Sequence, residues 1–171
     1  MRGLILALVV AVAACAPQTA SDSGVYRSAA APIYSIAAFD PGRLAGRWDQ
    51  VAAFAPYAKS ECRPGGAEFA RKADALQVTY RLCLSGQNLA GAGTIAATGP
   101  GRFAIAGKDS VGQDWWVLWV DEGYRTLVIG TPSGAFGFIL NQGKSLPADR
   151  LQAAREVLDF NGYNVENLVV Y

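Results

Sequence analysis

An alternation of apolar and polar residues constrains the fold more than any other feature of the sequence. In residues 76–84 every second residue is apolar, and most residues between them are polar. A period of two is typical of a β-strand with one buried face. Short apolar segments that predict further strands recur along the chain, several of them separated by Gly or Pro, at 48–54, 67–71, 92–98, 102–106, 115–120, 124–131 and 135–142.

The pattern changes after the eighth of these segments. Apolar residues follow helical spacing across 147–160, which predicts one α-helix that ends near Gly162, and 165–170 predicts a short final strand. We therefore expect an all-β fold: an eight-stranded up-and-down antiparallel β-barrel with one C-terminal α-helix packed outside. A barrel of this size has an interior wide enough for one small ligand.

Composition narrows the chemistry that such a barrel can perform. The 171 residues include no histidine, which excludes Ser-His-Asp and Cys-His catalysis and every His-ligated metal site. Three cysteines are too few for a Cys₄ metal site. Lys plus Arg is 15 and Asp plus Glu is 14, so no basic surplus is available to neutralise phosphates. We expect no metal, no cofactor, no nucleic-acid partner and no catalytic residues.

The N-terminus predicts a targeting segment. Residues 3–14 are all apolar or small, and Arg2 is the only charged residue before Asp22. A membrane-spanning helix needs about 20 such residues, so this shorter run is typical of a secretory signal peptide. The run ends in Val12-Ala13-Ala14-Cys15, which resembles the lipobox of bacterial lipoproteins. The resemblance implies cleavage before Cys15 and lipidation of that residue; the alternative is an ordinary signal peptide with an incidental cysteine.

The predicted organisation is a lipoprotein signal peptide at 1–14, a lipidated N-terminus and tether at 15–38, and a barrel domain at 39–171. Tyr26, Ile33, Tyr34 and Ile36 are the tether residues expected to pack on the domain. In enterobacterial lipoproteins a residue other than Asp after the lipidated Cys implies release to the outer membrane. We therefore expect a lipid-anchored protein of the cell envelope, in the outer membrane and facing the periplasm.

Three short motifs resemble the signatures of the lipocalins. Gly46 and Trp48 match the Gly-x-Trp that opens the first strand, and Asp121 and Tyr124 match the Asp-containing turn after the sixth strand. Residues 138–142 match the third signature, except that Gln142 stands where the family has Arg. In the family that Arg covers the first-strand Trp and closes one end of the barrel by a cation–π contact. The resemblance covers 39–171, and its nearest members are bacterial outer-membrane lipocalins and apolipoprotein D.

The other two cysteines predict a disulfide bond. Cys62 and Cys83 lie on either side of a predicted hairpin whose midpoint falls at residues 72–73. Antiparallel partners share that midpoint, and an envelope location permits oxidation. The alternatives are two free thiols or a redox pair.

Strand periodicity also predicts a ligand-binding wall, because alternate residues of a barrel strand point inward. The resemblance places position 142 inside the barrel, and Trp48 is expected deepest in it. Tyr80 and Gln50 are the polar groups expected to orient a head group. We predict that the wall consists of Phe54, Val78, Tyr80, Trp115, Val117, Trp119, Leu127, Ile129, Phe136, Phe138 and Leu140.

Together these features predict a membrane-anchored lipid-binding protein, monomeric or weakly dimeric. It would hold a fatty acid, a lysophospholipid or a similar apolar ligand inside the barrel, for lipid storage or transport in the envelope. Two alternatives stay open: an isomerase-like enzyme on the same barrel, and an interaction domain whose aromatic residues simply fill the core.

Overall fold

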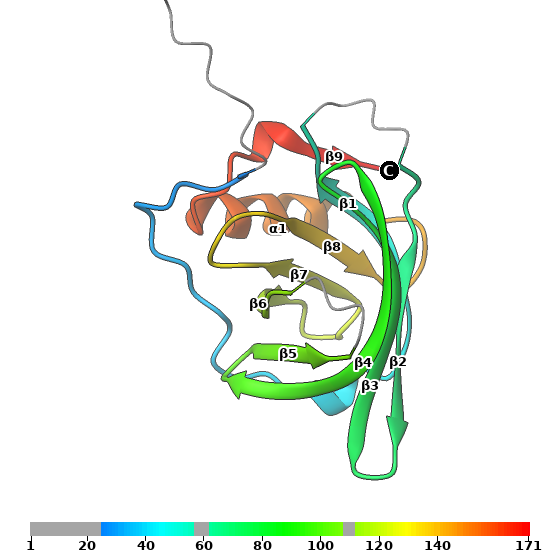
Figure 1. The fold of residues 1–171 in the computed structure, drawn as a ribbon. Helices are drawn as coiled ribbons and strands as arrows, with labels where there is room; N and C mark the ends of the chain where they lie inside the picture. Colours follow the sequence, from blue (N-terminus) through cyan, green and yellow to red (C-terminus); the bar gives the residue numbers. More distant parts are fainter. Residues whose placement is uncertain (1–24, 57–61, 108–111) are drawn as a thin grey trace, which may run out of the picture.

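The computed structural model describes residues 25–56, 62–107 and 112–171, and these form a closed antiparallel up-and-down barrel (Figure 1). Each strand pairs with the next one in the chain, and β1 pairs with both β8 and β2, which closes the barrel. The all-β, eight-stranded prediction is confirmed. The barrel strands are β1 Gly46–Phe54, β2 Gly66–Lys72, β3 Ala75–Leu84, β4 Gln87–Gly99, β5 Arg102–Ala106, β6 Trp115–Val120, β7 Thr126–Gly130 and β8 Gly137–Asn141.

The remaining elements lie outside the barrel wall. Helix α1, Ala148–Phe160, packs against strands β6 and β7, and the short strand β9, Leu168–Val170, pairs with β1. The final strand is shorter than predicted because Val165–Asn167 form the 3₁₀ helix η2, which the Asn164 side chain caps. Within the described ranges, no helix is both long enough and apolar enough to cross a bilayer.

Buried apolar side chains form two clusters, one on each side of the barrel wall. The interior cluster consists of Leu44, Trp48, Ala53, Ala67, Phe69, Val78, Tyr80, Leu82, Leu84, Phe103, Ile105, Trp115, Val117, Val120, Tyr124, Leu127, Ile129, Phe136, Phe138 and Leu140. The outer cluster lies between the sheet and α1 and consists of Tyr26, Val51, Ala52, Phe54, Leu118, Val128, Ile139, Ala154, Leu158, Tyr163 and Leu168.

Two register shifts decide which side chains face inward. In β1 the pairing with β8 shifts between Gln50 and Ala52, and in β6 the pairing with β7 shifts between Val117 and Trp119. Each shift inserts one unpaired residue, so every residue after it turns to the opposite face. Phe54 and Trp119 therefore lie on the outer side, and their prediction as ligand-binding residues is wrong.

The outward residues have structural roles instead. The ring of Phe54 lies 5.0 Å from that of Tyr163 and 5.5 Å from that of Tyr26, measured between centroids. Trp119 packs against the outer cluster. Inside the barrel, Ala53 lies opposite Phe138, where a regular alternation would place Ala52, and Val120 lies opposite Leu127, where it would place Trp119.

The segment before the barrel is packed from Tyr26 onward. Tyr26 is buried in the outer cluster, Ile33 packs against the same cluster, and Ile36 packs against the interior cluster. Tyr34 is 54% exposed and contacts only the ring of Phe160 among aromatic side chains of the described chain. The predicted lipidation site, Cys15, lies outside the described residues.

The Cys62–Cys83 disulfide is present, with the two Cα atoms 5.6 Å apart. Strands β2 and β3 pair with Gly66 opposite Arg81, so the hairpin brings the chain before β2 beside the end of β3. The bond therefore ties the start of the hairpin to its end, as the shared midpoint predicted.

We expect replacement of both cysteines, Cys62→Ser with Cys83→Ser, to lower the free energy of unfolding by about 3 kcal/mol, because the bond restricts the unfolded chain. Urea unfolding of the variant and of wild type, each with and without reductant, measures this. Reduced wild type is the matched control and should unfold at the same urea concentration as the variant. Equal stability of oxidised wild type and variant would contradict the prediction.

Candidate functional site

The barrel interior is the candidate site, and Trp115 lies at its centre. Its side chain is fully buried and contacts rings from three other strands. The centroid distances are 5.0 Å to Phe138 on β8, 5.4 Å to Tyr80 on β3 and 5.9 Å to Phe103 on β5. Because β3 and β6 are not neighbours in the sheet, the contact between Tyr80 and Trp115 reaches across the lumen.

Nine of the eleven predicted ligand-binding residues belong to the interior cluster. Their inward facing agrees with the sequence analysis, and contact with a ligand stays a prediction. They are Val78, Tyr80, Trp115, Val117, Leu127, Ile129, Phe136, Phe138 and Leu140. Sequence reasoning missed Phe103 and Ile105 because β5 is too short for its alternation to stand out.

The polar groups of the interior differ in whether they have hydrogen-bond partners. Gln50 donates from Nε2 to the carbonyl oxygen of Cys83 and accepts the Cys83 N–H at Oε1, both at 2.8 Å. Gln50 therefore fastens β1 to β3. Trp48 donates from Nε1 to the carbonyl oxygen of Leu44 at 2.8 Å. Trp115 Nε1 is buried and has no acceptor among the described residues.

The closed end of the barrel is sealed by the segment that precedes β1. The 3₁₀ helix η1, Pro41–Leu44, places Leu44 against Trp48 in the interior cluster. The Phe39 ring stacks on Tyr124, and the Arg43 guanidinium lies 3.8 Å from the centre of the Tyr124 ring. A cation–π contact is thus present at this end, with the cation supplied by η1.

Gln142 does not occupy the position that the family resemblance implied. Strand β8 ends at Asn141, and Gln142 is exposed beyond it. Its backbone N–H donates to the carbonyl oxygen of Arg125 at 2.7 Å. The prediction that position 142 faces the interior is therefore wrong, because the strand ends one residue too early.

The turn between β6 and β7 is organised by Asp121. Its Oδ1 accepts the backbone N–H groups of Arg125 and Thr126, both at 2.6 Å, and its Oδ2 lies 3.2 Å from the Arg125 Nε. Burial alone raises the pKa of Asp121, but these hydrogen bonds and the Arg125 charge outweigh burial and hold the pKa below its usual value. Asp121 and Tyr124 therefore have structural roles in this turn.

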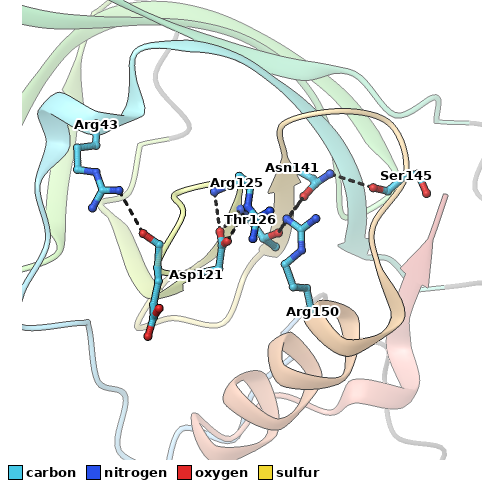
Figure 2. A network of polar contacts seen from close by, with 8 residues as sticks. Arg43, Asp121, Arg125, Thr126, Asn141, Ser145 and Arg150 are labelled. Carbon is cyan, nitrogen blue, oxygen red and sulfur yellow. Dashed lines mark hydrogen bonds and ion pairs between the residues drawn. The ribbon is translucent and has the colours of Figure 1, made fainter.

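Beside this turn, a polar network fastens α1 to the barrel (Figure 2). Arg150 on α1 donates to Thr126 Oγ1 at 2.6 Å and to Asn141 Oδ1 at 3.1 Å. Asn141 in turn donates to the carbonyl oxygens of Gly143 and Ser145. The polar groups of this network lie on the outer side of the wall, so it leaves the interior apolar.

The open end is held by hydrogen bonds between its loops. Ser85, in the β3–β4 turn, donates from Oγ to the carbonyl oxygen of Ala135 at 2.8 Å. The backbone N–H of Ser85 donates to the carbonyl oxygen of Phe54. The Tyr163 hydroxyl donates to the carbonyl oxygen of Phe136 and accepts the Thr131 N–H, which holds the β7–β8 loop from outside. Burial raises the pKa of Tyr163 to about 12, so this hydroxyl stays protonated at neutral pH.

A surface groove of about 890 Å³ lies on the outer face of strands β1 to β4. Sequence reasoning missed this groove. The feature that could have indicated it is a set of small residues at outward strand positions, Gly66, Ala90 and Ala92, which leave space on the outer face. Its charged lining residues are Arg47, Asp49, Glu68, Arg81 and Lys144.

In the described ranges, no three His, Cys, Asp or Glu side chains are grouped so that they could hold a metal ion.

Comparison with known proteins identifies the architecture. Residues 39–171 match the family model of the lipocalin-like domain. A comparison with curated protein sequences finds no match.

Three solved structures share the fold at low sequence identity, and at such identities the likeness shows the fold alone. Insecticyanin from the tobacco hornworm Manduca sexta is 16% identical, with a TM-score of 0.57 over 81% of this chain and 86% of that chain. The cockroach allergen Per a 4 is 13% identical, with a TM-score of 0.59 over 84% of this chain and 94% of the allergen. The siderocalin Ex-FABP, described as having dual ligand specificities, is 16% identical, with a TM-score of 0.55 over 74% of this chain and 92% of the siderocalin.

The Asp121 turn gives a prediction about acid stability. Because the pKa of Asp121 is lower in the folded chain than in the unfolded one, its contribution is complete above about pH 4 and is lost as the pH falls further. We expect Asp121→Asn to lower the free energy of unfolding at neutral pH by about 2 kcal/mol. The difference from wild type should shrink as the pH falls below about 4.

Urea unfolding at a series of pH values measures both effects. Glu122→Gln, at the exposed neighbouring position in the same turn, is the matched control and should behave like wild type. A difference between Asp121→Asn and wild type that stays constant down to low pH would show that ionisation of Asp121 is not the source of the stabilisation.

Proposed function

The chain belongs to the lipocalin-like domain family, and from this premise we propose that its barrel interior binds a small apolar ligand such as a fatty acid, a lysophospholipid or another lipid. Lipocalins typically bind small hydrophobic molecules. The observation that carries the proposal is the aromatic interior around Trp115, where one buried N–H group has no acceptor among the described residues. Ligand sites are mostly apolar, with a few polar groups that fix orientation.

The chemistry of the interior supports binding over catalysis. At the described strand positions that alternate inward there is no Asp, Glu or Lys, and the one Arg, Arg71, is exposed at the end of β2. General acid–base catalysis needs a proton donor or acceptor positioned beside the substrate. The Asp121 carboxylate, at the closed end, is already occupied by two backbone N–H groups and by Arg125. An isomerase-like role therefore has no support in the described part of the barrel.

We further propose that the barrel is anchored to a membrane through lipid on Cys15, in the bacterial cell envelope. The described chain begins beside the open end: Tyr26 donates its N–H to the carbonyl oxygen of Gly134 and Arg27 donates to that of Pro132, both in the β7–β8 loop. The ten Cα–Cα steps from Cys15 to Val25 span at most about 36 Å. Such a tether would keep the mouth near the bilayer and would suit ligand storage or transport there.

A second candidate is an interaction domain with a filled core. The ring contacts that cross the lumen at Trp115 favour it, because they leave less room for a ligand at that level. The groove on the outer face of β1 to β4 would then be the surface available for a partner. Ligand titration separates the two candidates.

The ligand proposal is tested with the Cys15→Ser chain, delipidated and titrated with fatty acids and lysophospholipids. Because Trp115 lies at the centre of the interior, we expect a saturable change in tryptophan fluorescence for at least one lipid. A water-soluble short-chain acid serves as the negative control. No saturable change with any lipid of the panel would favour the filled-core candidate.

The anchor proposal is tested by expressing the chain with its own N-terminus in a bacterial host. We expect the wild-type protein in the membrane fraction, with a mass increased by acyl chains, because several buried acyl chains bind a bilayer firmly. Cys15→Ser should move the protein to the soluble fraction without changing the barrel. Wild-type protein that is soluble and unmodified in a host that lipidates a reference lipoprotein would refute the anchor.

A further inference from the structure

The buried N–H group of Trp115 narrows the class of ligand that the barrel accepts. From this group and its surroundings we infer that the ligand places an uncharged oxygen acceptor, such as an ester or ketone carbonyl, against Trp115 Nε1. The inference rests on the proposed ligand-binding function and adds to it the chemistry of the group that meets the protein at the centre of the barrel.

The Trp115 N–H group has no hydrogen-bond acceptor among the described residues. Trp115 is fully buried, and none of the described residues accepts a hydrogen bond from its Nε1. Buried donors in folded proteins are nearly always paired, because removal from water without a new hydrogen bond is unfavourable. The two other interior side chains with N–H groups, Trp48 and Gln50, already donate to backbone carbonyl oxygens. Trp115 is therefore the donor that a bound molecule would satisfy.

No compensating charge lies beside Trp115 in the described interior. Arg71 alternates inward but is exposed at the end of β2, Arg43 stacks on Tyr124 at the closed end, and Arg102 stacks on Trp116 outside the wall. An ionised carboxylate beside Trp115 would gain one hydrogen bond but would lose its hydration with no cation to replace it. A carbonyl oxygen gains the same hydrogen bond at a much smaller desolvation cost.

Aromatic rings surround the Trp115 side chain. The rings of Tyr80, Phe103 and Phe138 lie around the Trp115 ring, with Phe138 nearly perpendicular to it at 80°. These apolar surfaces favour hydrocarbon on either side of the acceptor. The ligand class is therefore an uncharged lipid-like molecule that carries its carbonyl within an apolar skeleton, as an acyl ester or a long-chain ketone does.

The test compares three probes of matched chain length: methyl laurate, laurate and dodecane. Each is titrated into the delipidated Cys15→Ser chain, and binding is followed by calorimetry and by the indole N–H resonance of Trp115. We expect methyl laurate to bind about three- to tenfold more tightly than dodecane, the gain from one net hydrogen bond. Laurate should bind more weakly than its ester at neutral pH and approach it as acid protonates the carboxylate.

The variant Trp115→Phe keeps an aromatic ring and removes the N–H group. It should bind methyl laurate and dodecane equally, whereas Trp119→Phe, outside the barrel wall, should keep the preference of wild type. If Trp115→Phe unfolds, a shift of the wild-type Trp115 N–H resonance with methyl laurate but not with dodecane tests the same contact.

Two outcomes overturn the inference in distinguishable ways. Binding of all three probes with equal affinity, or an ester preference that survives Trp115→Phe, refutes the role of the N–H group and leaves the proposed ligand-binding function intact. Binding of none of the probes, together with failure of the wider lipid panel, refutes the proposed function and the inference with it.

Discussion

The fold depends on the double pairing of strand β1. Its first half pairs with β2 and its second half with β8, so one strand closes the barrel and removes both open edges. The register shift between Gln50 and Ala52 makes this possible, because a bulge bends the strand and increases its twist. The same shift turns Phe54 outward beneath Tyr163, so the closure of the barrel and the packing of its outer layer have one cause.

Closure also separates two environments with different chemistry. Polar side chains that fasten the structure, including Arg27, Asp121 and Arg150, lie outside the wall or at its closed end. The interior keeps aromatic and aliphatic surface, and Gln50 and Trp48 use their polar atoms to bind backbone. Trp115 is the exception among the described interior side chains that carry an N–H group. A barrel with this division is suited to hold an apolar molecule and to meet it with one specific contact.

Much of the architecture followed from the sequence pattern. The strand segments, the helix and the cysteine pair were predicted because alternation, helical spacing and a shared hairpin midpoint are local signals. The inward facing of Val78, Tyr80 and Phe138 followed from the same alternation. The errors at Phe54 and Trp119 share one cause, since a bulge reverses the facing of every later residue in the strand and leaves no mark in the hydrophobic pattern.

The sequence alone determined that this chain forms strands with one apolar face, in numbers that close a barrel, because side-chain period and turn residues act over a few neighbouring positions. The tertiary structure decided where each strand shifts register, that β8 ends before Gln142, and that Arg43 stacks on Tyr124 at the closed end. It also decided which polar atoms find partners. These outcomes depend on pairing between segments that are distant in the chain, so no local pattern contains them.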